Sequence, residues 1–168
     1  MGDKMKKSKI KILTYQNYLA MIKASQGSKM FQWFYVLIDG KKKDVLENGN
    51  LSCAYYVSSI LKIFDLIFQP HTTVKSTIED MLKSDWQLTK KLKLGNVLIW
   101  QEKKFPNGGI HQHIGFYLGQ NKAISNVSSP STTGVGSFPG IHHFTYGQTK
   151  TGQPKRKIIQ ILTHRLIK

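Results

Sequence analysis

The sequence predicts an α+β protein, and the order of its periodic segments carries this prediction. Apolar residues fall at helical spacing up to about residue 83, whereas an apolar period close to two dominates afterwards. The two patterns do not alternate, so parallel βαβ units are not expected. The chain has 168 residues, a length that suits one domain with its own core. No repeat or long linker divides it, and we expect a single domain over residues 1–168.

Three helices are predicted in the first half of the chain. A short amphipathic helix over residues 15–25 belongs to an N-terminal extension, residues 1–49, which precedes a core of residues 50–168. From Ser52, a natural N-cap, apolar residues continue at helical spacing as far as Phe68. This spacing indicates one long helix with a buried stripe. A third helix is predicted between the second helix and the strands, over residues 74–83.

About five strands are predicted after the third helix, and we expect them to form one antiparallel sheet against which the long helix packs. The predicted strands are residues 86–89, 96–101, 110–118, 122–127 and 155–163. Residues 128–137 and 147–154 are rich in turn-forming residues and are predicted to be loops. In the N-terminal extension, an apolar run leads to a turn at Asp39 and Gly40, and residues 41–50 are predicted to be a surface loop.

The composition narrows the possible classes of protein. There are 25 Lys and Arg residues against 9 Asp and Glu, which gives a formal net charge of +16. This charge favours an anionic neighbour such as nucleic acid, an acidic envelope polymer or a phospholipid surface, although a solvated lysine-rich surface explains it equally well. A single cysteine excludes an intramolecular disulfide framework and any multi-cysteine metal site. No glycine loop of the phosphate-binding kind is present, so no cofactor is expected.

The N-terminal segment does not look like a signal peptide or a membrane anchor. Residues 1–11 contain five lysines, but the segment that follows is interrupted by polar residues and lacks a hydrophobic region. No apolar run reaches the length of a membrane-spanning helix. We therefore expect a protein that is cytoplasmic or is released without an ordinary signal peptide. We also expect it to be a monomer.

Cys53 is the first candidate for chemistry. It lies in the first turn of the long predicted helix, where unpaired N–H groups and the helix dipole stabilise a thiolate. The same N–H groups would stabilise the oxyanion of an acyl-transfer intermediate. Taken alone, however, the position is also typical of a small core residue, because Cys53 lies on the apolar stripe of the helix.

A histidine pair on the strand over residues 110–118 favours a functional role for the cysteine. By alternation, His111, His113 and Gly115 share one face of this strand. Gly115 leaves room beside His113 for the close approach of another element. If this element is the helix that begins at Cys53, a thiol and an imidazole meet there.

A third group that orients the imidazole is expected on the next strand. A two-residue turn at Gln120 and Asn121 would place Asn126 on the face of His113, where its amide oxygen accepts from the imidazole N–H. A turn longer by one residue would present Ser125 instead. Asn126 is the preferred choice, because a Cys-His-Asn set is an established arrangement for nucleophilic catalysis.

These residues resemble a known family. A cysteine opens a helix, and it is followed by Gly-Asn-Val-Leu-Ile-Trp (95–100), His-Ile-Gly-Phe-Tyr-Leu-Gly (113–119) and Lys-Ala-Ile-Ser-Asn (122–126). This order resembles the NlpC/P60 group of papain-like cysteine peptidases and amidases, which is related to CHAP domains. The resemblance covers roughly residues 50–127. The chain departs from the family pattern around the cysteine, where Ser-Cys-Ala-Tyr replaces Asp-Cys-Ser-Gly, and it lacks the usual third histidine.

The resemblance implies a papain-like fold and a peptide or peptidoglycan-like substrate, cleaved through a thioester on Cys53 with His113 as the general base. Ser125 or Asn126 would take the third position. It also suggests a bacterial or phage origin, and an anionic wall would attract so basic a protein. We expect four further residues to line or border the substrate cleft: Tyr55, His111, Ser125 and His142.

Two other functions remain open. His111, His113, His142 and His143 could supply imidazoles to zinc, although no carboxylate obviously completes such a site. Basic clusters such as residues 41–43 and 155–157 could bind nucleic acid, but no nucleic-acid motif accompanies them. The peptidase interpretation is preferred to both.

Overall fold

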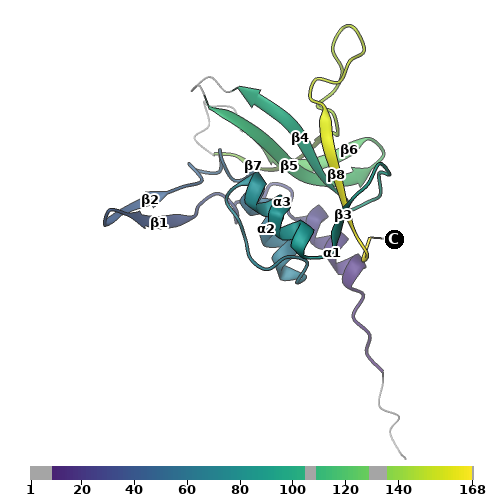
Figure 1. Cartoon of the computed structure of the whole chain (residues 1–168), viewed down its shortest axis with the longest axis horizontal. Helices are drawn as coiled ribbons and strands as arrows, with labels where there is room; N and C mark the ends of the chain where they lie inside the picture. Colours follow the sequence, from purple (N-terminus) through teal and green to yellow (C-terminus); the bar gives the residue numbers. More distant parts are fainter. Residues whose placement is uncertain (1–8, 105–108, 129–135, 168) are drawn as a thin grey trace, which may run out of the picture.

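The computed structural model describes residues 9–104, 109–128 and 136–167, and it has α+β architecture, as the sequence predicts (Figure 1). The described residues form three helices, α1 (Thr14–Ala24), α2 (Cys53–Ile63) and α3 (Val74–Lys83). None of these helices has the length and apolar character needed to cross a membrane.

The strands of the described residues form two antiparallel sheets. A separate hairpin consists of β1 (Tyr35–Ile38) and β2 (Lys41–Asp44). The main sheet has six strands in the spatial order β3-β8-β4-β5-β6-β7. Their bounds are β3 (Trp86–Leu88), β4 (Val97–Lys104), β5 (Ile110–Gly119), β6 (Lys122–Val127), β7 (Phe138–His143) and β8 (Ile158–His164).

The main sheet has one strand more than the five predicted, β7, and neither strand of the β1–β2 hairpin was predicted. Strand β7 pairs with β6 and begins directly after the loop predicted over residues 128–137, of which residues 129–135 lie outside the described part of the chain. The Pro139-Gly140 pair hides its strand pattern. Strand β2 replaces the start of the loop predicted over residues 41–50, because the turn at Asp39 and Gly40 folds a run of lysines back onto β1. The helix predicted as far as Phe68 ends at Ile63, since Asp65 adopts a left-handed φ of 51°.

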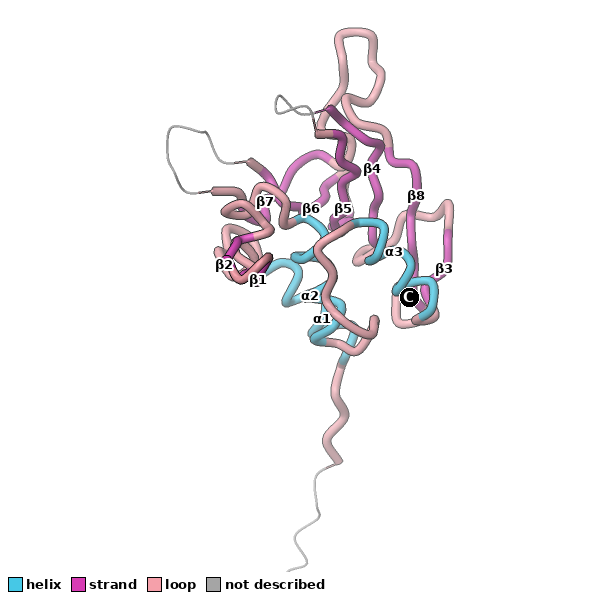
Figure 2. Tube along the Cα trace, turned by 60° about the vertical axis from the view of Figure 1, so that its left-hand side comes forward, coloured by secondary structure: helices cyan, strands magenta, loops and turns pink. Residues whose placement is uncertain are grey.

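The main core lies between the helices and one face of the main sheet (Figures 1 and 2). Helix α2 contributes a buried stripe that includes Tyr56, Ile60 and Leu61, and β5 contributes Ile114 and Phe116. All five side chains are fully buried. This packing fixes the start of α2, and therefore Cys53, against the middle of β5.

A second, smaller core covers the opposite face of the sheet. Leu98, Trp100 and Ala123 are fully buried there, and aromatic side chains from β5 and the segment after β7 pack against them. The Trp100 indole N–H donates to the main-chain oxygen of Phe144 at 2.7 Å. The segment that follows β7 is thereby held against the face of the sheet that carries His113.

The close approach predicted at Gly115 exists, but the neighbour is not α2. A Cβ atom built on Gly115 would lie 2.5 Å from the main-chain oxygen of Ile124, 2.6 Å from Cβ of Ser125 and 3.1 Å from the Trp100 ring. The neighbours are therefore strand β6 and the second core. Gly115 faces away from the side on which α2 packs against Ile114 and Phe116.

The predicted register of β5 and β6 is wrong by one residue. The two-residue turn is present, with Gln120 and Asn121 both at positive φ, and Gly119 pairs with Lys122. A bulge then intervenes, because Tyr117 pairs with Ala123 and the residue between Tyr117 and Gly119 has no partner in the register. The bulge makes Ser125, rather than Asn126, the partner of Gly115.

Replacing Gly115 by alanine is expected to reduce the free energy of unfolding by about 2–3 kcal/mol, because the new Cβ would overlap strand β6. Urea unfolding followed by circular dichroism measures this loss. The control is Gly152→Ala, whose Cβ meets no atom within 4 Å and whose positive φ of 78° costs only about 1 kcal/mol. Equal losses in the two variants would contradict the tight packing at Gly115.

Candidate functional site

Cys53 and His113 line the same cavity, which has a volume of about 380 Å³. Cys53 is the first residue of α2 and is half-buried, and His113 comes from β5. The connection before α2, the start of α3 and the outer end of β5 complete the walls. The two residues on which the sequence hypothesis depends therefore border one cavity. Among the described residues, no hydrogen bond joins their sulfur and ring nitrogens.

The electrostatic environment of Cys53 keeps its thiol protonated. Burial raises the pKa of the Cys53 thiol, and this effect exceeds the opposing ones. Main-chain hydrogen bonds from Ile114 and Ala54 and the charge of Arg156 act in the direction that lowers the pKa. The expected stabilising N–H groups are therefore present at the sulfur, but the resting thiolate that they were expected to produce is not favoured.

His113 is also uncharged at rest. Burial lowers the pKa of His113 to about 3, and the charges of Arg156 and His142 act in the same direction. A main-chain hydrogen bond with Asn126 opposes this shift. The ring lies beside Trp100, with 5.5 Å between the ring centroids. The site at neutral pH therefore holds a neutral thiol and a neutral imidazole.

Ser125 connects His113 to two further side chains. The Ser125 side chain is fully buried, and its Oγ lies 2.9 Å from Nε2 of His113. The same oxygen lies 2.7 Å from Nε2 of His142 and 2.9 Å from the hydroxyl of Tyr146. The rings of His142 and Tyr146 stack with 4.1 Å between their centroids. We call this set (His113, Ser125, His142 and Tyr146) the serine network.

The preferred third residue, Asn126, does not direct its side chain at His113. Its amide N–H donates to the main-chain oxygen of Gly49, and its buried Oδ1 has no hydrogen-bond partner among the described residues. This corrects the choice made from the sequence, because the bulge in β5 moves Asn126 to the other face of its strand. The alternative, Ser125, is the residue that contacts the imidazole.

The other three expected cleft residues lie in different places. His111 is exposed and lines the cavity. His142 contacts Ser125 and does not line this cavity. Tyr55 packs its ring against the ring of Phe34, with 5.1 Å between the two centroids. Of the residues expected to contact substrate, His111 is therefore the one that shares the cavity with Cys53 and His113.

The sequence hypothesis missed Tyr146 and Arg156. Arg156 belongs to a basic cluster that the sequence presents as a solvated turn, yet only 9% of it is exposed. Its guanidinium donates to the main-chain oxygens of Gln101 and His111 and lies over the ring of Tyr146. No local spacing pattern singles out either residue, because each reaches the site through a long-range contact.

The arrangement gives no support to a histidine-bound zinc ion. Nε2 of both His113 and His142 is directed at Ser125, and Nδ1 of His143 contacts the hydroxyl of Thr145. The described residues contain no group of three or more histidine, cysteine or acidic side chains that could hold a metal ion.

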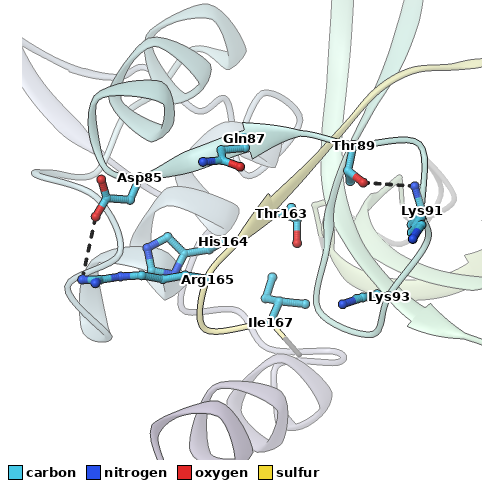
Figure 3. A pocket seen from close by; sticks show the side chains of 9 residues that line it. All are labelled: Asp85, Gln87, Thr89, Lys91, Lys93, Thr163, His164, Arg165 and Ile167. Atoms are coloured by element: carbon cyan, nitrogen blue, oxygen red, sulfur yellow. Dashed lines mark hydrogen bonds and ion pairs between the residues drawn. The ribbon is translucent and has the colours of Figure 1, made fainter.

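A second cavity, of about 510 Å³, lies apart from these residues (Figure 3). Strand β3, the connection that follows it and the end of β8 form its walls, and Lys91, Lys93 and Arg165 make it basic. An ion pair of 3.8 Å joins Arg165 to Asp85 at one side. The cavity contains neither a nucleophile of the cysteine type nor a member of the serine network, so we place the candidate chemistry at Cys53.

Comparisons with protein-family models, with curated proteins and with solved structures found no match to this chain. The functional assignment therefore depends on the residues and their geometry.

Proposed function

We propose that this protein is a cysteine peptidase or amidase that hydrolyses an amide bond through a thioester on Cys53. One observation carries the proposal: a cysteine at the first residue of α2 and a histidine on β5 line one cavity. A helix start packed on an antiparallel sheet also agrees with the papain-like, NlpC/P60-type fold that the sequence resemblance implies. We therefore extend the proposal to that fold.

In the proposed reaction, Sγ of Cys53 attacks the amide carbonyl carbon while its proton passes to His113. The N–H groups near the start of α2 stabilise the charge that develops during attack. The imidazolium of His113 then gives its proton to the departing amine, which breaks the C–N bond and leaves the thioester. Water attacks the thioester, with its proton passing through His113 back to the sulfur, and the acid is released.

The serine network determines which nitrogen of His113 is basic. Nδ1 of His142 lies 2.8 Å from the main-chain oxygen of His143, and a carbonyl oxygen can only accept, so this nitrogen carries hydrogen. Burial lowers the pKa of His142, so its ring is neutral and its Nε2 accepts a hydrogen bond from Ser125. Oγ of Ser125 then accepts from Nε2–H of His113. Nδ1 of His113 is therefore the nitrogen that we propose takes up the thiol proton, and the main-chain hydrogen bond with Asn126, which raises the pKa of His113, favours the imidazolium that forms.

Tyr146 completes the same chain of hydrogen bonds. Burial raises the pKa of Tyr146 to about 12, so its hydroxyl remains protonated and donates to Ser125. Ser125 thus donates one hydrogen bond and accepts two, which is the full capacity of a hydroxyl group. The network holds His113 in one tautomer without placing a charge beside it.

We propose peptidoglycan stem peptides as the substrate class. The net charge of +16 would draw the protein to an anionic wall polymer. The cavity beside Cys53 combines apolar side chains such as Val45 and Ile110 with the charged side chains of Lys75 and Glu102. This mixture suits a peptide that carries charges of both signs.

Cys53→Ala is expected to abolish the cleavage of purified muropeptides, because no other thiol exists in the chain. Product formation is followed by mass spectrometry, and thermal unfolding shows whether the variant retains the fold. Cleavage that persists in a folded Cys53→Ala protein would refute the proposed mechanism.

The thiol of Cys53 is expected to react slowly with iodoacetamide at neutral pH, because its raised pKa leaves little thiolate. The labelling rate, measured by mass spectrometry between about pH 5 and pH 10, should continue to rise beyond about pH 9. A rate that reaches a plateau near pH 6 would instead indicate a resting thiolate–imidazolium pair, in disagreement with the electrostatics of the site.

Ser125→Ala is expected to lower kcat about 100-fold, at the lower end of what a general base contributes, because His113 loses the partner that fixes its tautomer. Nitrogen-15 NMR of the histidine rings should show His113 changing from one tautomer to a mixture. The matched control is Ser128→Ala, an exposed serine near the end of the same strand. An unchanged His113 spectrum in Ser125→Ala would contradict the role of the network.

A further inference from the structure

The β1–β2 hairpin is an amphipathic ribbon that extends from the body of the protein (Figure 1). Asp39 and Gly40 form its turn, both at positive φ. One strand is entirely aromatic or aliphatic and the other begins with three lysines. The paired residues are Tyr35 with Asp44, Val36 with Lys43, Leu37 with Lys42 and Ile38 with Lys41.

The apolar strand is open to solvent on both faces. The exposed fraction is 76% for Leu37, 54% for Tyr35 and 46% for Ile38. Successive side chains of a strand point to opposite faces, so Tyr35 and Leu37 lie on one face and Ile38 lies on the other. Exposed apolar surface concentrated in this way marks a site of interaction.

Lysines accompany the apolar side chains on each face. Lys42 shares a face with Tyr35, and its Nζ lies 4.1 Å from the centroid of that ring. Lys41 and Lys43 lie on the opposite face with Ile38. Asp44 is already engaged at the base of the hairpin, where its carboxylate accepts from three main-chain N–H groups. Asp39 at the turn is the other acidic residue of the hairpin.

We infer that the β1–β2 hairpin binds the surface of an anionic lipid bilayer. The apolar side chains of β1 enter the interfacial zone, and the lysines of β2 contact lipid phosphates. A bilayer interface offers both an apolar layer and a negative surface, and it surrounds both faces of the ribbon at once. This inference does not depend on the proposed peptidase activity.

Other occupants fit the hairpin less well. A second copy stacked on either face would place lysines opposite lysines, because both faces of the ribbon carry them. Nucleic acid would satisfy the lysines but would leave Leu37 and Ile38 in water, since aliphatic side chains provide no plane on which bases stack. A lipid interface is the partner that uses both halves of the ribbon.

The hairpin is attached next to the candidate active site. Phe34, just before β1, packs on Tyr55 of α2, and Val45, just after β2, lines the cavity that contains Cys53. A docked hairpin would therefore hold this cavity close to the bilayer surface.

Co-sedimentation of the whole protein with lipid vesicles tests the inference. One set of vesicles contains phosphatidylcholine alone, and the other contains phosphatidylcholine with phosphatidylglycerol. We expect binding to the anionic vesicles only, and weaker binding when salt is raised from about 0.1 M to about 0.5 M.

Three hairpin variants separate the two contributions. Replacing Lys41, Lys42 and Lys43 together by serine should weaken binding about 100-fold, since each lysine near an anionic surface contributes about fivefold. Leu37→Ser with Ile38→Ser should weaken it about tenfold. Asp39→Asn, which keeps the turn geometry, should strengthen it severalfold.

The matched control removes the same charge elsewhere. Lys90, Lys91 and Lys93 are exposed lysines outside the hairpin, and replacing them by serine should change binding less than about threefold, because they lie away from the proposed contact. An equal loss in this control would overturn the inference, since binding would then follow overall charge. The inference would also be overturned by equal binding to neutral and anionic vesicles, or by no binding to anionic vesicles. The same holds if the hairpin mediates dimers or nucleic-acid complexes and not vesicle binding.

Discussion

The contact between Gly115 and Ser125 is the constraint on which the candidate site depends. Because Gly115 has no side chain, strand β6 and Trp100 approach it closely, and Ser125 reaches Nε2 of His113 at 2.9 Å. A side chain at position 115 would overlap the main chain of Ile124 and displace Ser125. The bulge before Gly119 matters equally, since it sets the register that makes these residues partners.

The site is built from neutral groups around one buried cation. Burial disfavours the thiolate of Cys53 and the imidazolium of His113, so neither charge exists at rest. Arg156 favours a thiolate and disfavours an imidazolium. In the proposed mechanism, charge separation is therefore coupled to attack on the substrate, when the developing negative charge meets main-chain N–H groups. The serine network orients the His113 ring through hydrogen bonds between neutral groups, so it adds no charge to the site.

Sequence periodicity predicted the elements whose apolar faces are buried in the main core. Helix α3 matches its predicted bounds of 74–83, and β6 matches 122–127. The three strands that were not predicted, β1, β2 and β7, bury little apolar surface or lack an alternating pattern. Strand β2 consists mainly of exposed lysines, and β7 contains Pro139 and Gly140, so neither shows the alternation that marks a half-buried strand. The end of α2 was placed too late because Phe64 and Phe68 continue the helical spacing of apolar residues, although both lie beyond the helix and Phe68 is exposed.

The sequence by itself determined that Cys53 begins a helix and that His113 shares a strand face with Gly115, because both follow from local spacing. The tertiary structure alone decided which residue contacts His113. Choosing between Ser125 and Asn126 required the register of two strands, and a single bulged residue reverses the face that each side chain occupies. It also brought in Tyr146 and Arg156, which reach the site through packing between segments far apart in the chain.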